Sequence, residues 1–202
     1  MTPILIGVTG GIGSGKSIVC RICALRGIPV YDCDSRAKAI MKADPDIRAF
    51  LLSEIGEEVY RPDGELDRKL LGARIFSDPH TRARLEARVH EAVRSDIAVW
   101  LSSLAGMHTL ALVESAILDT SALDEAVDSI WLVQAPMEMR LLRVMARSAL
   151  SRQEVQARMS VQQAEFDSLP TGKVTAIIND GLMPLIPAID SLIIQTNKKT
   201  IH

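Results

Sequence analysis

Short runs of consecutive apolar residues recur along this chain and are typical of strands covered on both faces. Helical stretches separate most of these runs, which is the alternation expected of βαβ units. A further segment, Leu192–Ile194, is compatible with a helix end or a short strand. The pattern predicts an α/β fold in which a three-layer doubly wound parallel sheet forms the core. The five expected strands are Ile4–Val8, Ile28–Tyr31, Leu110–Val113, Ile130–Val133 and Ala176–Ile178.

The expected strands are unevenly spaced. The long stretch between Tyr31 and Leu110 contains no good buried-strand run and consists mainly of amphipathic helical pieces. We therefore expect a helical subdomain at about 32–104 that holds a second substrate. Its expected helices are Ser35–Lys42, Pro45–Ile55, Asp67–Phe76 and a long one from Pro79 through Trp100.

Local signals mark where several of these elements begin. Asp44-Pro45 and Asp78-Pro79 are typical helix starts, with aspartate as N-cap and proline at the first helical position. Ser151 and Glu154 have the spacing of a capping box, which predicts another helix start. The segment Arg61–Gly64, which reads Arg-Pro-Asp-Gly, predicts a turn.

A second insertion, at about 136–173, follows the fourth expected strand. Pro136 starts a helix on which Arg140, Arg143 and Arg147 share one face. Such a row is usually a solvated face. Here it directly follows a strand and has few acids beside it, and guanidinium groups bind phosphate in bidentate fashion. We therefore favour a helical lid that closes over phosphate.

Composition narrows the class of protein. The chain has 202 residues, 48% of them hydrophobic and 24% charged, and a formal net charge of −2 at pH 7. These values are ordinary for a globular domain and argue against a general nucleic-acid binder. No apolar run is long enough to span a bilayer, and no secretory signal is recognisable. We expect a cytoplasmic protein, with a monomer favoured, that binds neither nucleic acid nor membrane.

Three cysteines are too few for a disulfide framework. Cys20 and Cys23 have the spacing of a redox or zinc motif, but no second pair completes a tetrahedral site. The pair also lies inside an expected helix. Buried free thiols are therefore the preferred interpretation of Cys20, Cys23 and Cys33.

The segment Gly10–Ser17 reads GGIGSGKS and matches the G-x-x-x-x-G-K-[ST] phosphate-loop pattern. A flexible glycine turn is the alternative, but an apolar strand precedes the segment and a helical pattern comes after it. That order aims backbone N–H groups and the positive end of a helix dipole at one phosphate-binding point. Lys16 would reach the β- and γ-phosphates of ATP, and the Ser17 hydroxyl would bind Mg²⁺. The expected nucleotide-binding residues are Gly11, Ile12, Gly13, Ser14, Gly15, Lys16 and Ser17.

Two aspartates come after the second expected strand. Ligands of open α/β sheets bind at the carboxyl ends of the strands, so Asp32 and Asp34 should face the phosphate loop. If the segment is extended, carboxylates at i and i+2 point the same way. We expect Asp34 to act as a base and Asp32 to hold Mg²⁺ through water. The alternative for Asp34 is a cap on the helix that begins at Ser35.

Two further residues are weaker candidates. Glu114 ends the third expected strand and could contact Mg²⁺ or the acceptor, although an acid in this position is often only solvated. His90 lies within an expected helix, where a lone histidine is more often a packed or surface residue than a catalyst.

Taken together, these motifs resemble the dephospho-CoA kinase family, and the resemblance extends over essentially the whole chain in the right order. The phosphate loop alone is shared with many kinases, so its combination with the aspartate pair and two lid arginines makes the resemblance specific. The matching segments are Ile6–Ser17, Asp32-Cys33-Asp34, Gly64-x-Leu66-Asp67-Arg68, His90, Arg143-x-x-x-Arg147 and Asn179-Asp180-Gly181.

The resemblance implies a P-loop kinase fold and the last step of coenzyme A synthesis, in which ATP and dephospho-CoA give ADP and CoA. It implies a core at about 1–31, 105–135 and 174–202, besides the CoA-binding helical subdomain and the lid. Asp34 would be the base for the ribose 3′-hydroxyl. Lys16, Arg143 and Arg147 would stabilise the transferring phosphoryl group, and Asn179 would lie near the adenine. The implied acceptor-site residues are Asp32, Asp34, Arg68, His90 and Glu114.

The chain departs from the family pattern at three places, none of them in the phosphate loop. Glu91 follows the histidine where the family usually has proline, Asp119-Thr120 replaces an aromatic residue and glutamate, and Lys173-Val174 replaces alanine and aspartate. These departures affect details of acceptor binding and leave the expected reaction unchanged.

Two other functions fit part of the sequence. Another P-loop nucleoside or nucleotide kinase would share the core and the lid. A nucleotide-dependent switch would bind GTP or ATP to control a partner. A GTPase would need an Asn-Lys-x-Asp motif at a strand end, but the chain's Asn-Lys pair, Asn197-Lys198, lies in the tail. The arginine row also fits a transferase better than a switch.

Overall fold

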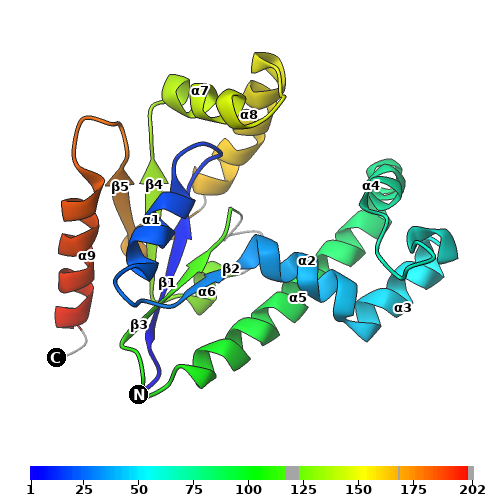
Figure 1. Ribbon diagram of the computed structural model, residues 1–202, viewed down its shortest axis with the longest axis horizontal. Coiled ribbons are helices and arrows are strands. Elements are labelled where there is room, and N and C mark those ends of the chain that lie inside the picture. The colour runs from blue at the N-terminus through cyan, green and yellow to red at the C-terminus, as the bar shows by residue number, and fades with distance from the viewer. Residues whose placement is uncertain (117–122, 168, 200–202) are drawn as a thin grey trace. The chain divides into compact units, whose positions relative to one another are not determined.

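The computed structural model describes residues 1–116, 123–167 and 169–199, and it contains a five-stranded, all-parallel sheet (Figure 1). The strand order is β2-β3-β1-β4-β5. Each expected strand is confirmed, with small shifts in its ends. The bounds are β1 Ile4–Thr9, β2 Val30–Asp32, β3 Leu110–Glu114, β4 Ser129–Gln134 and β5 Val174–Ile178.

Strand β2 begins later than expected because Pro29 precedes it. Proline has no backbone N–H to donate to a ladder, so regular pairing with β3 starts at Val30. The Pro29 carbonyl still accepts a hydrogen bond from the Leu112 N–H, at 2.9 Å. At the other end of the strand, Asp32 lies opposite Glu114 in the β2–β3 register.

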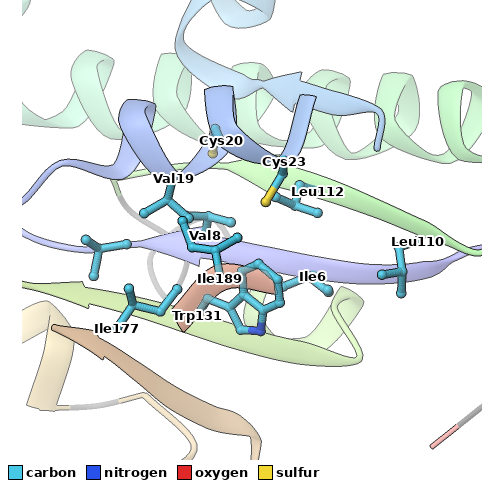
Figure 2. Close-up of a cluster of buried hydrophobic side chains, with 11 residues drawn as sticks. Ile6, Val8, Val19, Cys20, Cys23, Leu110, Leu112, Trp131, Ile177 and Ile189 are labelled. Atoms are coloured by element: carbon cyan, nitrogen blue, oxygen red, sulfur yellow. The ribbon is translucent and has the colours of Figure 1, made fainter. Parts of the chain in front are cut away.

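One face of the sheet packs against α1 (Lys16–Ala24) and α9 (Leu185–Lys199), as Figure 2 shows. Alternate residues of the strands, among them Ile6 and Trp131, meet Val19 from α1 and Ile189 from α9 in this core. Their neighbours in the strands point to the opposite face. These neighbours are also buried: Leu5, Ala111, Val113 and Ile130. Burial on both faces explains why the strands are continuous apolar runs.

The segment Leu192–Ile194, whose structure the sequence left open, lies within α9. Leu192 and Ile193 pack against the core, whereas Ile194 is exposed. Arg26 forms a two-bond ion pair with Asp190 of α9, with N–O distances of 2.6 and 3.0 Å. Because that pair is partly exposed, apolar burial is the main force that holds α9 on the sheet.

The chain divides into two compact units, Met1–Asp32 with Leu101–His202, and Cys33–Trp100. The second unit is helical, and its buried residues include Phe50, Leu51 and Leu85. Its helices are α2 Cys33–Ala43, α3 Pro45–Glu54, α4 Arg68–Ser77 and α5 Pro79–Ser103, with a short 3₁₀ turn at Glu57–Val59. The last residues of α5 belong to the first unit.

The predicted helix starts and turn are confirmed. The Asp44 carboxylate accepts hydrogen bonds from the backbone N–H groups of Asp46 and Ile47, both at 2.9 Å. Asp78 does the same for His80 and Thr81 at 3.1 Å, so each aspartate caps the helix that begins at the following proline. In the predicted turn, the Gly64 N–H donates to the Arg61 carbonyl at 2.9 Å.

Two helices of the first unit, α7 (Met137–Arg147) and α8 (Arg152–Asp167), come after β4. Pro136 is the N-cap of α7 and not its first residue. The capping box is confirmed, since the Ser151 N–H donates to the Glu154 carboxylate at 2.7 Å and the Glu154 N–H donates to the Ser151 hydroxyl at 3.3 Å. The helices share a buried cluster, defined by Leu141, Val144, Val155 and Met159, against which Ile12 and Leu150 pack.

Two shorter elements complete the described chain. Helix α6 (Leu123–Ala126) lies before β4, and a 3₁₀ turn at Thr171–Lys173 leads into β5. Among the helices that the structure describes, none is both long enough and apolar enough to cross a membrane.

We predict that Ile189→Ala destabilises the protein much more than Ile194→Ala. Ile189 is fully buried in the core between α9 and the sheet, so truncation leaves a cavity and should cost about 2–5 kcal/mol. Ile194 lies on the same helix but is 55% exposed, and its truncation should cost less than about 1 kcal/mol. Urea unfolding of both variants measures the difference, and equal losses would contradict this packing of α9.

Candidate active site

The phosphate loop connects β1 to α1 at the centre of the sheet, where it passes close to other backbone segments. Gly13 has a φ of 81°, and a Cβ there would lie 2.4 Å from the Arg140 carbonyl oxygen. Gly15 has a φ of 106°, and a Cβ there would lie 2.2 Å from the amide nitrogen of Asn179. Both positions combine a left-handed backbone with close contact, so only glycine fits without strain.

Four side chains bind carbonyl oxygens of this loop. Lys16 Nζ donates to the Gly10 carbonyl at 2.6 Å, and Arg140 Nε donates to the Ile12 carbonyl at 3.0 Å. The Ser14 carbonyl accepts from the Asn179 side-chain amide at 2.7 Å. Arg143 Nη1 lies 3.4 Å from the carbonyl oxygens of both Gly13 and Ser14.

With several of its carbonyls bound, the loop can present amide groups on its other side, except for those of Ile12 and Ser14, which donate to Gln162 Oε1 and to the Gly11 carbonyl. A trans peptide points its N–H and C=O groups in opposite directions. Helix α1 begins at Lys16, so the positive end of its dipole lies at this loop. This arrangement can bind a phosphate group.

Oxygen ligands for a cation lie at the start of α1. The Ser17 hydroxyl donates to Glu114 Oε1 at 2.7 Å, and Asp32 is the register partner of Glu114 on the next strand. Within the described residues there is no group of three or more His, Cys, Asp or Glu side chains that could enclose a metal. Mg²⁺ usually takes only one or two protein ligands and completes its shell with water and substrate phosphates, so this sparse oxygen set fits it.

The structure contradicts the expectation that Asp32 and Asp34 lie on one extended segment. Strand β2 ends at Asp32, and α2 begins at Cys33 without an intervening loop, so Asp34 lies in the first turn of a helix. It is therefore not a cap before a helix that starts at Ser35. Asp32 and Asp34 also belong to different compact units of the chain.

The other expected acceptor-site residues lie in the helical unit. Arg68 is the first residue of α4 and is exposed. Its neighbour Asp67 caps that helix, and the hydrogen bond from the Leu70 N–H is the main cause of the lowered pKa of the Asp67 carboxyl. His90 is half-buried in α5, and burial lowers the pKa of its imidazole, which favours the neutral ring.

Three arginines share the expected face of α7, but their surroundings differ. Arg140 and Arg143 are half-buried and contact the phosphate loop, whereas Arg147 lies one turn further along the helix and is exposed. Burial lowers the pKa of the Arg140 guanidinium. Arg143 Nη2 also donates to the Asn179 carbonyl at 3.3 Å.

Asn179 comes directly after β5 and lies against the phosphate loop. Its backbone N–H donates to the Gln134 carbonyl at 2.8 Å, which continues the pairing of β4 with β5. Its side-chain nitrogen is engaged by the Ser14 carbonyl. The position of Asn179 near an adenine ring stays a prediction.

Two loop contacts were not predicted. From the sequence, Arg140 belongs to the arginine row but is not expected among the site residues, and Gln162 has no expected role. In the structure, Gln162 Oε1 accepts a hydrogen bond from the Ile12 N–H at 2.8 Å. The only sequence signal for Arg140 was its helical spacing from Arg143. A polar residue on α8 carries no comparable signal.

The three cysteines are free and buried, as expected. Burial is the main cause of the raised pKa of both Cys20 and Cys23, and the pKa of Cys23 is raised to about 11. The nearby Glu114 carboxylate adds to the effect at Cys20.

None of the positions that depart from the family pattern belongs to the phosphate-loop segment Gly10–Ser17. Glu91 is exposed on α5, and Val174 begins β5. Lys173 Nζ donates to the carbonyls of Asp124 and Val127, at 3.3 and 3.1 Å. Asp119 and Thr120 lie outside the described residues.

Comparison with known proteins decides among the candidate kinases. The family model for dephospho-CoA kinase matches residues 4–183. The chain belongs to the dephospho-CoA kinase family. A dephospho-CoA kinase from Bacteroides fragilis is 36% identical over 190 residues, which cover 94% of this chain and 91% of the relative.

Solved structures agree with the fold. A structure from Thermus thermophilus has a TM-score of 0.79 and 33% identity, over 96% of this chain and 98% of that one. A dephospho-CoA kinase from Campylobacter jejuni has a TM-score of 0.71 and 22% identity, over 98% of both chains, which shows a common fold.

Family membership confirms the reaction expected from the motifs. The chain is a kinase that phosphorylates dephospho-CoA to coenzyme A with ATP as the phosphoryl donor. This function is favoured over that of another P-loop nucleoside or nucleotide kinase. The fold class is confirmed as well, since helices flank a five-stranded parallel sheet.

We predict that alkylating reagents modify the native cysteines very slowly at pH 8. Only the thiolate reacts. A pKa raised from 9.0 to about 11 leaves Cys23 with about 100-fold less thiolate at pH 8 than a thiol of unshifted pKa would have. Burial further shields all three thiols. Mass spectrometry should find three modified cysteines after unfolding in urea. Rapid modification of native Cys20 or Cys23 would show that these residues are exposed and contradict the expectation.

Proposed function

We propose that phosphoryl transfer to the ribose 3′-hydroxyl of dephospho-CoA takes place where the phosphate loop meets Ser17 and Glu114. One observation carries the proposal. The loop's carbonyl oxygens are bound by Lys16, Arg140, Arg143 and Asn179, and the opposite side of the loop is therefore left for the phosphates of ATP.

The phosphate loop would bind ATP through residues 11–17. Its amide groups would hold the phosphates, and the Lys16 ammonium would leave the Gly10 carbonyl, or share it, to reach the β- and γ-phosphates. Because the loop backbone is already held by its contacts with other side chains, its amide groups need little reorganisation when negative charge develops on the transferred group. Asn179 would border the adenine side of the nucleotide from its place beside Gly15.

Ser17, Glu114 and Asp32 would hold Mg²⁺, with Ser17 as a direct ligand. Bound there, the ion would neutralise negative charge on the phosphates of ATP. The hydrogen bond that Ser17 donates to Glu114 fixes the orientation of the Ser17 hydroxyl beside the carboxyl end of β3. Asp32 would contribute through a bound water molecule.

The helical unit, 33–100, would bind dephospho-CoA, and Asp34 would be the catalytic base. The Asp34 carboxylate lies in the first turn of α2. It could accept the proton of the 3′-hydroxyl and orient that oxygen toward the γ-phosphorus. Arg68 and His90 would contact the acceptor.

Helices α7 and α8, within 136–173, would form the lid. Arg143 and Arg147 would stabilise the charge of the transferring group, as guanidinium groups do in related phosphoryl-transfer sites. We further propose that the protein acts as a monomer in the cytoplasm.

Release of ADP from purified protein tests the proposal. Dephospho-CoA should support turnover, and the same assay with nucleosides and nucleoside monophosphates should give little. Removal of Mg²⁺ with a chelator should abolish turnover, and added Mg²⁺ should restore it. Phosphorylation of a nucleoside at a comparable kcat/KM would reject the proposed acceptor, whereas chelator-resistant turnover would reject the magnesium site.

We predict that Asp34→Asn lowers kcat by about 10²–10⁴-fold, the usual worth of a general base. The amide keeps the size of the side chain but cannot take the proton. The affinity for ATP should change little, since the loop and Lys16 bind the phosphates. Asp46→Asn, in the first turn of α3, is the matched control and should leave kcat unchanged. Turnover of Asp34→Asn within a few-fold of the parent would exclude Asp34 as the base.

We predict that Arg143→Ala and Arg147→Ala lower kcat more than they weaken dephospho-CoA binding. Arginines that act on charge developing in the transition state lower kcat by about 10²-fold when removed. Steady-state kinetics with varied dephospho-CoA separates the two effects. A variant that keeps its kcat and loses acceptor affinity would place its arginine in the acceptor site instead.

A further inference from the structure

Ile12 connects the phosphate loop to both helices of the lid. Its backbone N–H donates to Gln162 Oε1 of α8 at 2.8 Å, and its carbonyl accepts from Arg140 Nε of α7 at 3.0 Å. Its side chain packs against the buried cluster that α7 and α8 share. Ile12 therefore contacts the lid through its backbone N–H, its carbonyl and its side chain.

The residues on either side of Ile12 make its contacts with the lid important for the conformation of the loop. Gly11 and Gly13 flank it, and glycine has the largest backbone freedom of any residue. The loop sequence cannot by itself hold the Ile12 peptide groups in one orientation. The contacts with Arg140 and Gln162 supply that restraint, from positions 128 and 150 residues away in the chain.

The two polar contacts differ in what they can do. Arg140 donates to the Ile12 carbonyl, and its guanidinium also lies over Gly11, where a Cβ would come within 2.0 Å of it. Gln162 supplies an acceptor for an N–H group in a partly buried place. A donor left without an acceptor costs more than a neutral hydrogen bond contributes, so the orientation of this peptide depends strongly on Gln162.

We propose that Gln162 is a positioning residue for ATP binding. By accepting the Ile12 N–H it fixes the first half of the phosphate loop, so that the amide groups of the second half are oriented before the phosphates arrive. It acts through the loop backbone and touches neither substrate. This role is separate from the charge stabilisation proposed for Arg143 and Arg147, and it does not depend on the identity of the acceptor.

The test replaces Gln162 with Met, which keeps its length and removes the strong acceptor. The matched control is Gln153→Met, an exposed position on the same helix. Calorimetry gives the Kd for ATP in the absence of acceptor, and steady-state kinetics gives the KM for dephospho-CoA. Preorganisation lost with one unsatisfied donor should weaken ATP binding about 10-fold. The KM for dephospho-CoA should change less than about 2-fold, and the control should match the parent in both.

Hydrogen exchange of the Ile12 amide, followed by ¹⁵N NMR, distinguishes positioning from general support of the helix. Exchange should become about 10-fold faster in Gln162→Met and stay unchanged in Gln153→Met. Gln162→Glu keeps an acceptor oxygen and should restore protection when measured without ATP. Gln162→Asn is one methylene shorter and should behave like Gln162→Met, and it serves as the test if the methionine variant does not fold.

The proposal is overturned if ATP affinity and Ile12 exchange in Gln162→Met or Gln162→Asn both match the parent. It is also overturned if the protein melts at a lower temperature while ATP affinity is unchanged, since Gln162 would then only stabilise α8. Equal loss of protection in Gln162→Glu and Gln162→Met would show that the acceptor oxygen is not the cause.

Discussion

The arrangement of this enzyme depends on one requirement, that the carbonyl oxygens of the phosphate loop be bound by other parts of the protein. Amide groups can converge on a phosphate only if the carbonyls turn toward the protein interior, where an oxygen without a donor is costly. In this chain Lys16, Arg140, Arg143 and Asn179 provide the donors. The loop is therefore ordered by residues of α1, α7 and the end of β5.

The sheet topology makes this possible. Strand β1 lies between β3 and β4, so the loop after β1 is adjacent to the segment after β4 and to the end of β3. Helix α7 starts directly after β4 and brings Arg140 and Arg143 to the loop. Glu114 ends β3 and reaches Ser17. Helices α7 and α8 thus support the loop, because Ile12 packs against the cluster that they share.

Strands and helix starts were predicted well from the sequence where neighbouring residues determine them. Buried parallel strands must be apolar on both faces, so the five runs identified the five strands. Aspartate before proline identified two helix starts because the cap and the fixed φ act within one turn. The error at Asp34 has a local cause too. The pattern shows that the strand ends, but it does not show that α2 begins at Cys33 without an intervening loop.

The sequence by itself determined the phosphate loop and the order of strands and helices, because each rests on residues that are close in the chain. It indicated the family through several such local motifs that occur in the right order. Tertiary structure alone decided which side chains complete the site. Arg140 contacts the loop while Arg147 is exposed, although one helical pattern includes both. Ser17 meets Glu114 across 97 positions, and Ile12 meets Gln162 across 150. A hydrogen bond needs its atoms placed to within a few tenths of an ångström, and only the packing of distant elements sets such distances.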